Sequence, residues 1–112
     1  MDMGRIEQYN AYWVTLDPTQ GSEIAKTRPC VVISPDELNY YLNTVVIVPL
    51  TSTLRNYPFR LQCRLAGKIG ELAIDQVRTV DKTRLNVSNP LGQLSANEII
   101  ALKSLLNEMF CC

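Results

Sequence analysis

The side chains best suited to chemistry in this chain are arginines, carboxylates and hydroxyls, because the sequence contains no histidine. They fall into three groups, which are Glu23, Lys26 and Arg28, then Thr51 and Ser52, and finally Asp75, Gln76 and Arg78. A guanidinium stays charged and offers a planar fork that matches phosphate oxygens. A carboxylate accepts a proton from a group at hydrogen-bond distance. If the three groups meet at one rim, they form a candidate phosphate site.

Structural roles are open to the same side chains. Arg28 is able to form a salt bridge with Glu23 or Asp75, and the Thr51 hydroxyl is able to cap its own loop. Asp75 follows an apolar run, so we expect its carboxylate to be partly buried, with Arg78 as its natural partner. On residue type alone, a structural ion pair is the favoured role for Asp75 and Arg78.

Other catalytic arrangements are incomplete in this sequence. Ser–His and Cys–His pairs fail without histidine, and neither a Walker loop nor a dinucleotide-binding glycine pattern is present. The four cysteines lack CxxC spacing, so we expect no zinc site, and Cys30 lies in an apolar run as a small buried hydrophobe. A two-metal carboxylate site from Asp17, Glu23 and Asp75 is an alternative, although nearby arginines compete for the carboxylates. We therefore expect no metal and no other cofactor.

Several short strands are expected to position these groups. Runs rich in β-branched and aromatic residues predict strands at 9–16, 29–34, 44–50 and 59–65, with shorter strands at 71–74 and 78–80. The continuous apolar run 44–50 predicts burial on both faces. Gly67 and Gly70 are expected to bracket a turn, and Ser34 to cap a short helical turn at 35–39.

The end of the chain predicts a helix that packs on these strands. Ser95 and Glu98 fit a capping box, and Leu94 and Ile99 occupy the positions of a hydrophobic staple. An apolar stripe with helical spacing then runs through residues 99–109. Short strands followed by one helix indicate a mainly β fold, a small barrel or strongly curved sheet, and residues 1–112 are expected to form one domain.

Charge and hydropathy exclude several classes of protein. The net charge is zero, which argues against nucleic-acid binding through a global positive field. Residues 55–84 nevertheless carry seven basic against three acidic side chains, a distribution compatible with an anionic partner. Residues 1–5 lack the apolar core of a signal peptide, and no apolar run approaches the roughly 20 residues of a membrane span. We expect a cytoplasmic protein without membrane contact.

The order and spacing of the motifs between residues 9 and 85 form one larger pattern. It comprises Tyr12-Trp13-Val14, Leu16-Asp17-Pro18-Thr19, Gly21-Ser22-Glu23, Lys26-Thr27-Arg28-Pro29, Val31-Val32-Ile33-Ser34, Pro49-Leu50-Thr51-Ser52, Tyr57-Pro58, Asp75-Gln76-Val77-Arg78-Thr79-Val80-Asp81-Lys82 and Arg84-Leu85. This pattern resembles the MazF/PemK toxins. The resemblance implies a small SH3-like barrel of the CcdB/PemK type with a C-terminal helix, usually a homodimer. It also implies a type II toxin–antitoxin toxin that cleaves single-stranded RNA at short sequences without metal and so stops translation.

The same resemblance assigns roles and partners. Arg28 matches the family's catalytic arginine, Thr51 its catalytic threonine and Glu23 an assisting glutamate, while Asp75 lies in the motif that supplies an active-site aspartate. The cognate antitoxin is expected to lay a flexible segment across the active rim and to supply most of the contact with operator DNA. The expected products are a 2′,3′-cyclic phosphate and a 5′-hydroxyl.

Base recognition is expected in the loops 17–27 and 52–58. The candidate RNA contacts are Lys26, Ser52, Arg55, Tyr57, Gln76 and Arg78. The sequence departs from the family pattern at three places, because Gln8-Tyr9-Asn10 replaces the usual arginine-glycine-acid opening, Ser22 a histidine of some members and Ala73 an arginine of PemK-like members. A mechanism that depends on that histidine or on a second arginine is therefore not expected.

Two other functions remain as alternatives. One is a non-enzymatic toxin of the same fold that poisons DNA gyrase, as CcdB does. That activity is associated with a Trp-Gly-Ile terminus, whereas this chain ends Met109-Phe110-Cys111-Cys112. The other is a catalytically silent barrel that binds RNA or a peptide.

Overall fold

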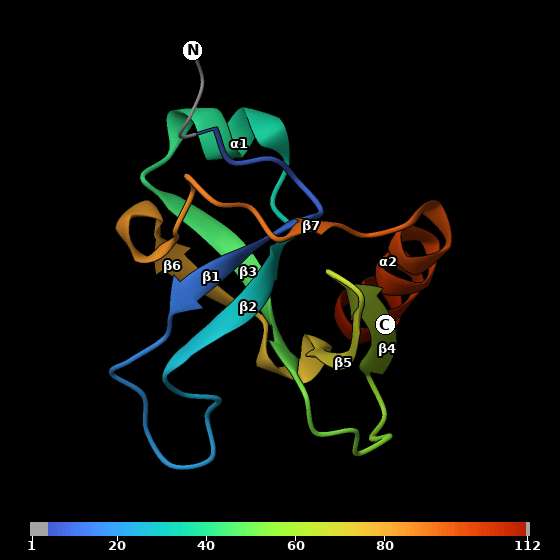
Figure 1. Cartoon of the computed structure of the whole chain (residues 1–112). Coiled ribbons are helices and arrows are strands. Elements are labelled where there is room, and N and C mark those ends of the chain that lie inside the picture. The colour runs from blue at the N-terminus through green and yellow to red at the C-terminus, as the bar shows by residue number, and fades with distance from the viewer. Residues whose placement is uncertain (1–4, 112) are drawn as a thin grey trace.

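Seven strands form one curved sheet in the computed structural model, which describes residues 5–111 (Figure 1). The strands are β1 (Asn10–Thr15), β2 (Thr27–Val32), β3 (Thr44–Thr51), β4 (Arg60–Leu65), β5 (Lys68–Ala73), β6 (Arg78–Asp81) and β7 (Gly92–Gln93). They run in the order β4-β5-β3-β2-β1-β7, and β6 pairs with β3 outside this path. The predicted mainly β fold with a C-terminal helix is confirmed.

The long strand β3 organises the sheet because its partner on one edge changes along its length. Residues 44–47 pair with β6, whereas Leu50 and Thr51 pair with Leu72 and Glu71 of β5. The chain crosses from β5 to β6 through a short 3-10 helix, η1 (Ile74–Gln76). The segment that carries Asp75 is therefore held where β3 leaves β6 and joins β5.

Both faces of the central strands are buried, as the apolar run in β3 predicts. Alternate residues enter two separate cores, with Val45 and Ile47 in the first and Val48 in the second. Cys30 is fully buried in the first core, which agrees with its expected role as a small hydrophobe. Rigid packing on both faces gives the loops at the strand ends a fixed base.

The C-terminal helix α2 (Ala96–Phe110) starts as its sequence predicts. The Ser95 hydroxyl accepts the Glu98 N–H at 3.2 Å, and the Glu98 carboxylate accepts the Ser95 N–H at 2.8 Å, which completes the capping box. The second Glu98 oxygen accepts the Arg64 N–H of β4 at 2.8 Å, so the cap also fixes the helix to the sheet. Leu102, within α2, is fully buried. None of the helices in residues 5–111 combines the length and apolar character that a membrane span needs.

The predicted turn at Gly67 and Gly70 is only half right. The β4–β5 hairpin turns at Ala66 and Gly67, which have φ of 51° and 78°. Gly70 instead lies within β5, opposite Cys63. A Cβ atom at residue 70 would approach Leu50 Cγ to 2.9 Å. Gly70 therefore leaves room for the Leu50 side chain of β3 and does not form the turn.

The predicted capping role of Ser34 is wrong. Helix α1 (Asp36–Tyr41) begins after Pro35 and has no side-chain cap. The Ser34 hydroxyl bonds instead to buried Asn39 at 2.5 Å and accepts the Val46 N–H of β3 at 3.0 Å. Ser34 therefore fixes α1 to the sheet through side-chain contacts.

A further helical turn, η2 (Lys82–Arg84), follows β6.

Candidate functional site

The loop between β1 and β2 (residues 16–26, the β1–β2 loop) meets η1 around a pocket of about 400 Å³. Glu23 of the first sequence group and all of the third group, Asp75, Gln76 and Arg78, line it, whereas Lys26, Arg28 and Thr51 are not among its lining residues. The Gln76 side-chain oxygen accepts the Ile24 N–H at 2.7 Å and fixes the loop against η1. Gln76, predicted as an RNA contact, therefore also has a structural role.

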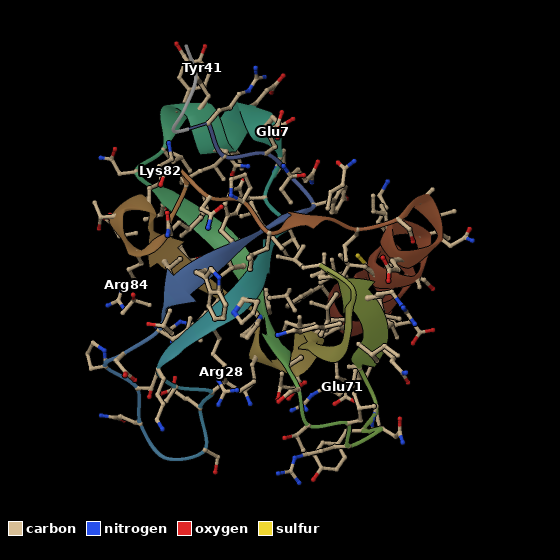
Figure 2. The ribbon with its side chains drawn as sticks, viewed as in Figure 1. Glu7, Arg28, Tyr41, Glu71, Lys82 and Arg84 are labelled. Atoms are coloured by element: carbon tan, nitrogen blue, oxygen red, sulfur yellow. The ribbon has the colours of Figure 1, made fainter. Side chains whose placement is uncertain are left out.

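Arg28 and Thr51 occupy facing ends of β2 and β3. The β2–β3 ladder ends at Cys30 and Pro49, so Arg28 and Thr51 each lie two residues beyond its last pair, at the same end of the sheet. Arg28 Nε donates to the Ala25 carbonyl at 3.2 Å, and the side chain projects between the β1–β2 loop and the end of β3 (Figure 2).

The Thr51 hydroxyl caps its own loop, as the structural alternative expects. Its Oγ1 accepts the Thr53 N–H at 3.2 Å. A hydroxyl that accepts one bond still has its own hydrogen to donate. Thr51 is half-buried, and this bond fixes the position of its hydroxyl. The capping role and a role as donor are compatible.

Positive charge gathers beside this pair of strand ends. Arg78 Nη1 donates to the Leu16 carbonyl at 3.3 Å, which ties β6 to the start of the β1–β2 loop. Burial raises the pKa of the Cys30 thiol to about 12, against the opposing effects of Arg78 and Arg28. The two guanidiniums donate to carbonyl groups at either end of the β1–β2 loop, Leu16 and Ala25. Their charges favour an anionic ligand at this rim.

Asp75 pairs with Arg60, so the predicted partnership with Arg78 is wrong. Arg60 Nε and Nη2 donate to the two Asp75 oxygens at 2.6 and 3.1 Å. The prediction of a partly buried carboxylate is also wrong, because the Asp75 side chain is 41% exposed while that of Arg60 is 7% exposed. Arg60 stands opposite Ala73 in the β4–β5 ladder. Arg60 therefore brings a further guanidinium to Asp75 from β4, whereas the sequence analysis expected no mechanism that depends on a second arginine.

Glu71 is a buried carboxylate that the sequence analysis counted only as a charge. Its side chain is 2% exposed and accepts Arg60 Nη1 at 3.1 Å. It also accepts the N–H groups of Arg55 and Asn56 at 3.1 and 3.0 Å. Burial raises the pKa of Glu71, but these bonds outweigh it and hold the pKa below its usual value. The signal in the sequence is a single carboxylate inside the apolar run 69–74.

Glu23 and Arg28 remain separate. Glu23 is exposed and accepts the Gln20 N–H within its own loop. Among residues 5–111, the ion pairs do not join Arg28 to Glu23 or to Asp75, so the salt-bridge alternative for Arg28 is wrong. The same described range contains no group of three or more His, Cys, Asp or Glu side chains able to hold a metal ion.

Comparison with known proteins shows which family the chain belongs to. The model of the PemK-like, MazF-like toxins of type II toxin–antitoxin systems matches residues 7–110. The chain belongs to this family. It is 33% identical over 106 residues to the endoribonuclease toxin MazF of Escherichia coli K12, covering 95% of this chain and 90% of that protein. It is 30% identical over 108 residues to the endoribonuclease MazF of Staphylococcus epidermidis, covering 91% and 88%.

Solved structures share the PemK/MazF fold. The crystal structure of MazF from Deinococcus radiodurans aligns with a TM-score of 0.81 at 22% identity, covering 96% of this chain and 97% of that one. An endoribonuclease from a mycobacterial species, in complex with its cognate antitoxin, aligns at 0.76 and 20% identity, covering 92% of each chain. The predicted CcdB/PemK-type architecture is thereby confirmed.

The other predicted RNA contacts of this PemK/MazF chain lie in two loops that project from the same end of the sheet (Figure 1). Lys26 is exposed in the β1–β2 loop. Ser52, Arg55 and Tyr57 are exposed in the β3–β4 loop (residues 52–59). The Tyr57 ring, 51% exposed, has the Arg60 guanidinium 5.3 Å from its centroid and that of Arg55 at 5.9 Å. Their contact with RNA stays a prediction.

Proposed function

We propose that this chain is the endoribonuclease toxin of a type II toxin–antitoxin pair, which cleaves single-stranded RNA at short sequences in the cytoplasm and inhibits translation. The observation that supports the proposal is that the start of β2, with Arg28, and the end of β3, with Thr51, lie at the same end of the sheet as a pocket lined by Glu23 and Arg78. The naming of curated relatives as endoribonucleases supports the same reaction.

The proposed reaction is an attack of a ribose 2′-hydroxyl on its own phosphate. The O2′–P bond forms and the P–O5′ bond breaks, which leaves a 2′,3′-cyclic phosphate and a 5′-hydroxyl. Glu23 accepts the 2′-hydroxyl proton, because both oxygens of Asp75 are already occupied by Arg60. The 5′-oxygen takes its proton from solvent.

Arg28 and Thr51 stabilise the charge that develops on the phosphoryl oxygens. A guanidinium stays protonated in proteins and is a poor proton donor, so Arg28 acts through its charge and its N–H groups. Donors fixed before the reaction need no reorganisation in the transition state. Arg28 and Thr51 sit at the ends of strands that are packed on both faces, so these donors are fixed before the reaction begins.

Incubation of the purified chain with a long RNA in the presence of EDTA tests the proposal. We expect cleavage at a recurring short sequence, with cyclic-phosphate ends, and an uncut all-deoxy copy of the preferred site because DNA lacks the 2′-hydroxyl. Intact RNA, or cleavage that EDTA abolishes, would contradict it. Inhibition of gyrase supercoiling with intact RNA would instead support the gyrase alternative.

We also propose a homodimer, with the second copy on an apolar groove of about 850 Å³ between α2 and the β3–β6 edge. Val46, Leu106 and Phe110 line this groove. Val77 and Arg78 line both the groove and the candidate pocket, so a second copy seated there borders the site. A cognate antitoxin is proposed to cover the positively charged rim and to provide the contact with operator DNA.

Replacing Phe110 with glutamate is expected to convert the dimer into a monomer. The side chain is 64% exposed and lines the groove, so a buried charge there would cost several kcal/mol. Ile100→Glu is the matched control, because Ile100 is 65% exposed on the same helix but does not line the groove. Light scattering should give about twice 12.6 kDa for the wild type and the control. A monomeric wild type would refute the dimer.

A further inference from the structure

Arg60 joins three parts of the site that are separate in the sequence. Its guanidinium binds Asp75 on η1 through two nitrogens and Glu71 on β5 through the third. The same group lies over the Tyr57 ring of the β3–β4 loop, 5.3 Å from its centroid. Only 7% of the Arg60 side chain is exposed, although it lies beside a loop made largely of exposed residues.

The contact with Glu71 extends this connection to the loop backbone. The Glu71 carboxylate accepts the N–H groups of Arg55 and Asn56, in the middle of the β3–β4 loop. A continuous set of contacts therefore runs from Asp75 through Arg60 and Glu71 to the main chain of the loop. Each contact is a hydrogen bond to a charged group, which makes it stronger than a neutral hydrogen bond.

We propose that Arg60 is a positioning residue that holds the β3–β4 loop and Asp75 in a fixed relation. A guanidinium is planar and rigid, so it cannot move toward one of these partners without weakening its contact with another. The inference deepens the proposed function, because the β3–β4 loop is the proposed base-contacting segment and Asp75 lines the proposed phosphate pocket. RNA-base selection and phosphate positioning then depend on the same side chain.

Amide hydrogen exchange at Arg55 and Asn56 tests the inference without RNA. In Arg60→Ala we expect the two amides to exchange about tenfold faster, because Glu71 loses the partner that fixes its carboxylate. Arg60→Lys should not restore protection, since an ammonium is a point charge that cannot bind both Asp75 oxygens and Glu71. Asp75→Ala should also speed exchange at the loop.

Arg64→Ala is the matched control. Arg64 lies four residues along β4 on the same face as Arg60 and is exposed, so its removal should leave both amides unchanged. Exchange at the wild-type rate in Arg60→Lys and Asp75→Ala would overturn the inference, because charge alone or local packing would then be enough to protect the two amides. If Arg60→Ala does not fold, these two variants carry the test.

Cleavage kinetics provide the second measurement. For the preferred RNA, Arg60→Ala and Arg60→Lys should raise KM about tenfold, lower kcat and broaden the set of cleaved sequences, whereas Arg64→Ala should change none of these. Unchanged sequence preference and KM in the Arg60 variants would contradict the inference. A wild-type protein that cleaves no RNA would refute the proposed nuclease instead, and the exchange measurement would still decide the role of Arg60.

Discussion

Replacing Arg28 with alanine is expected to lower the rate of RNA cleavage by about 10²–10³-fold, the usual effect of removing one preorganised donor to a developing charge. The change should have little effect on folding, because the Arg28 side chain is half-buried and donates only to the Ala25 carbonyl among the hydrogen bonds of the described residues. A net hydrogen bond of this kind contributes about 1 kcal/mol. Single-turnover cleavage and thermal unfolding measure the two effects separately.

Arg28→Lys is the informative companion to this variant. It keeps the positive charge but not the planar fork, so we expect a rate between those of the wild type and Arg28→Ala. Arg64→Ala removes a guanidinium from a different part of the sheet and should cleave at the wild-type rate. Full activity in Arg28→Ala would remove Arg28 from the proposed site.

Replacing Glu71 with alanine is expected to destabilise the fold by about 3–5 kcal/mol, the usual cost of breaking a buried ion pair by removing one partner. The 7% exposed Arg60 side chain would lose one of its two carboxylate partners, and the Arg55 and Asn56 N–H groups would lose their acceptor. Glu71→Gln keeps the shape and one acceptor oxygen and should cost less. Urea unfolding at neutral pH measures both free energies.

The same carboxylate predicts how stability depends on acid. Burial raises the pKa of Glu71, but its hydrogen bonds outweigh burial and lower the folded-state value. A lowered folded-state pKa stabilises the protein above the unfolded-state pKa, about 4.3 for glutamate, and this contribution is lost as pH falls through the folded-state value. Wild-type stability should therefore decline below about pH 4, and Glu71→Gln should decline less steeply. Equal slopes would contradict this account.

The elements with local determinants were predictable from the sequence. The apolar run in β3 and the capping box of α2 each specify their own structure through neighbouring residues, and both are confirmed. The facing ends of β2 and β3 also follow, because consecutive antiparallel strands bring Arg28 and Thr51 to one end of the sheet.

The partners of Asp75 and Glu71 were not predictable in this way. The bond between Arg60 and Asp75 depends on the register of β4 against β5, which places Arg60 opposite Ala73. The spacing of residues within a single segment does not indicate which residues of β4 and β5 stand opposite each other. The choice of Arg78 as the partner rested on sequence proximity, yet Arg78 donates to the Leu16 carbonyl at the start of the β1–β2 loop. The role of Gly70 likewise depends on the distance to another strand.

The contact between Glu71 and the β3–β4 loop determines which residues of that loop can be substituted. The carboxylate binds main-chain N–H groups, which every amino acid except proline provides at residue 55. Residue 56 is more restricted, because Asn56 has a φ of 56°, a conformation that favours asparagine or glycine. Exposed side chains at residues 52–55 and 57 are therefore free to vary without loss of the anchor. A library randomised at these positions, with Asn56, Arg60 and Glu71 retained, is the natural starting point for evolving new sequence preferences.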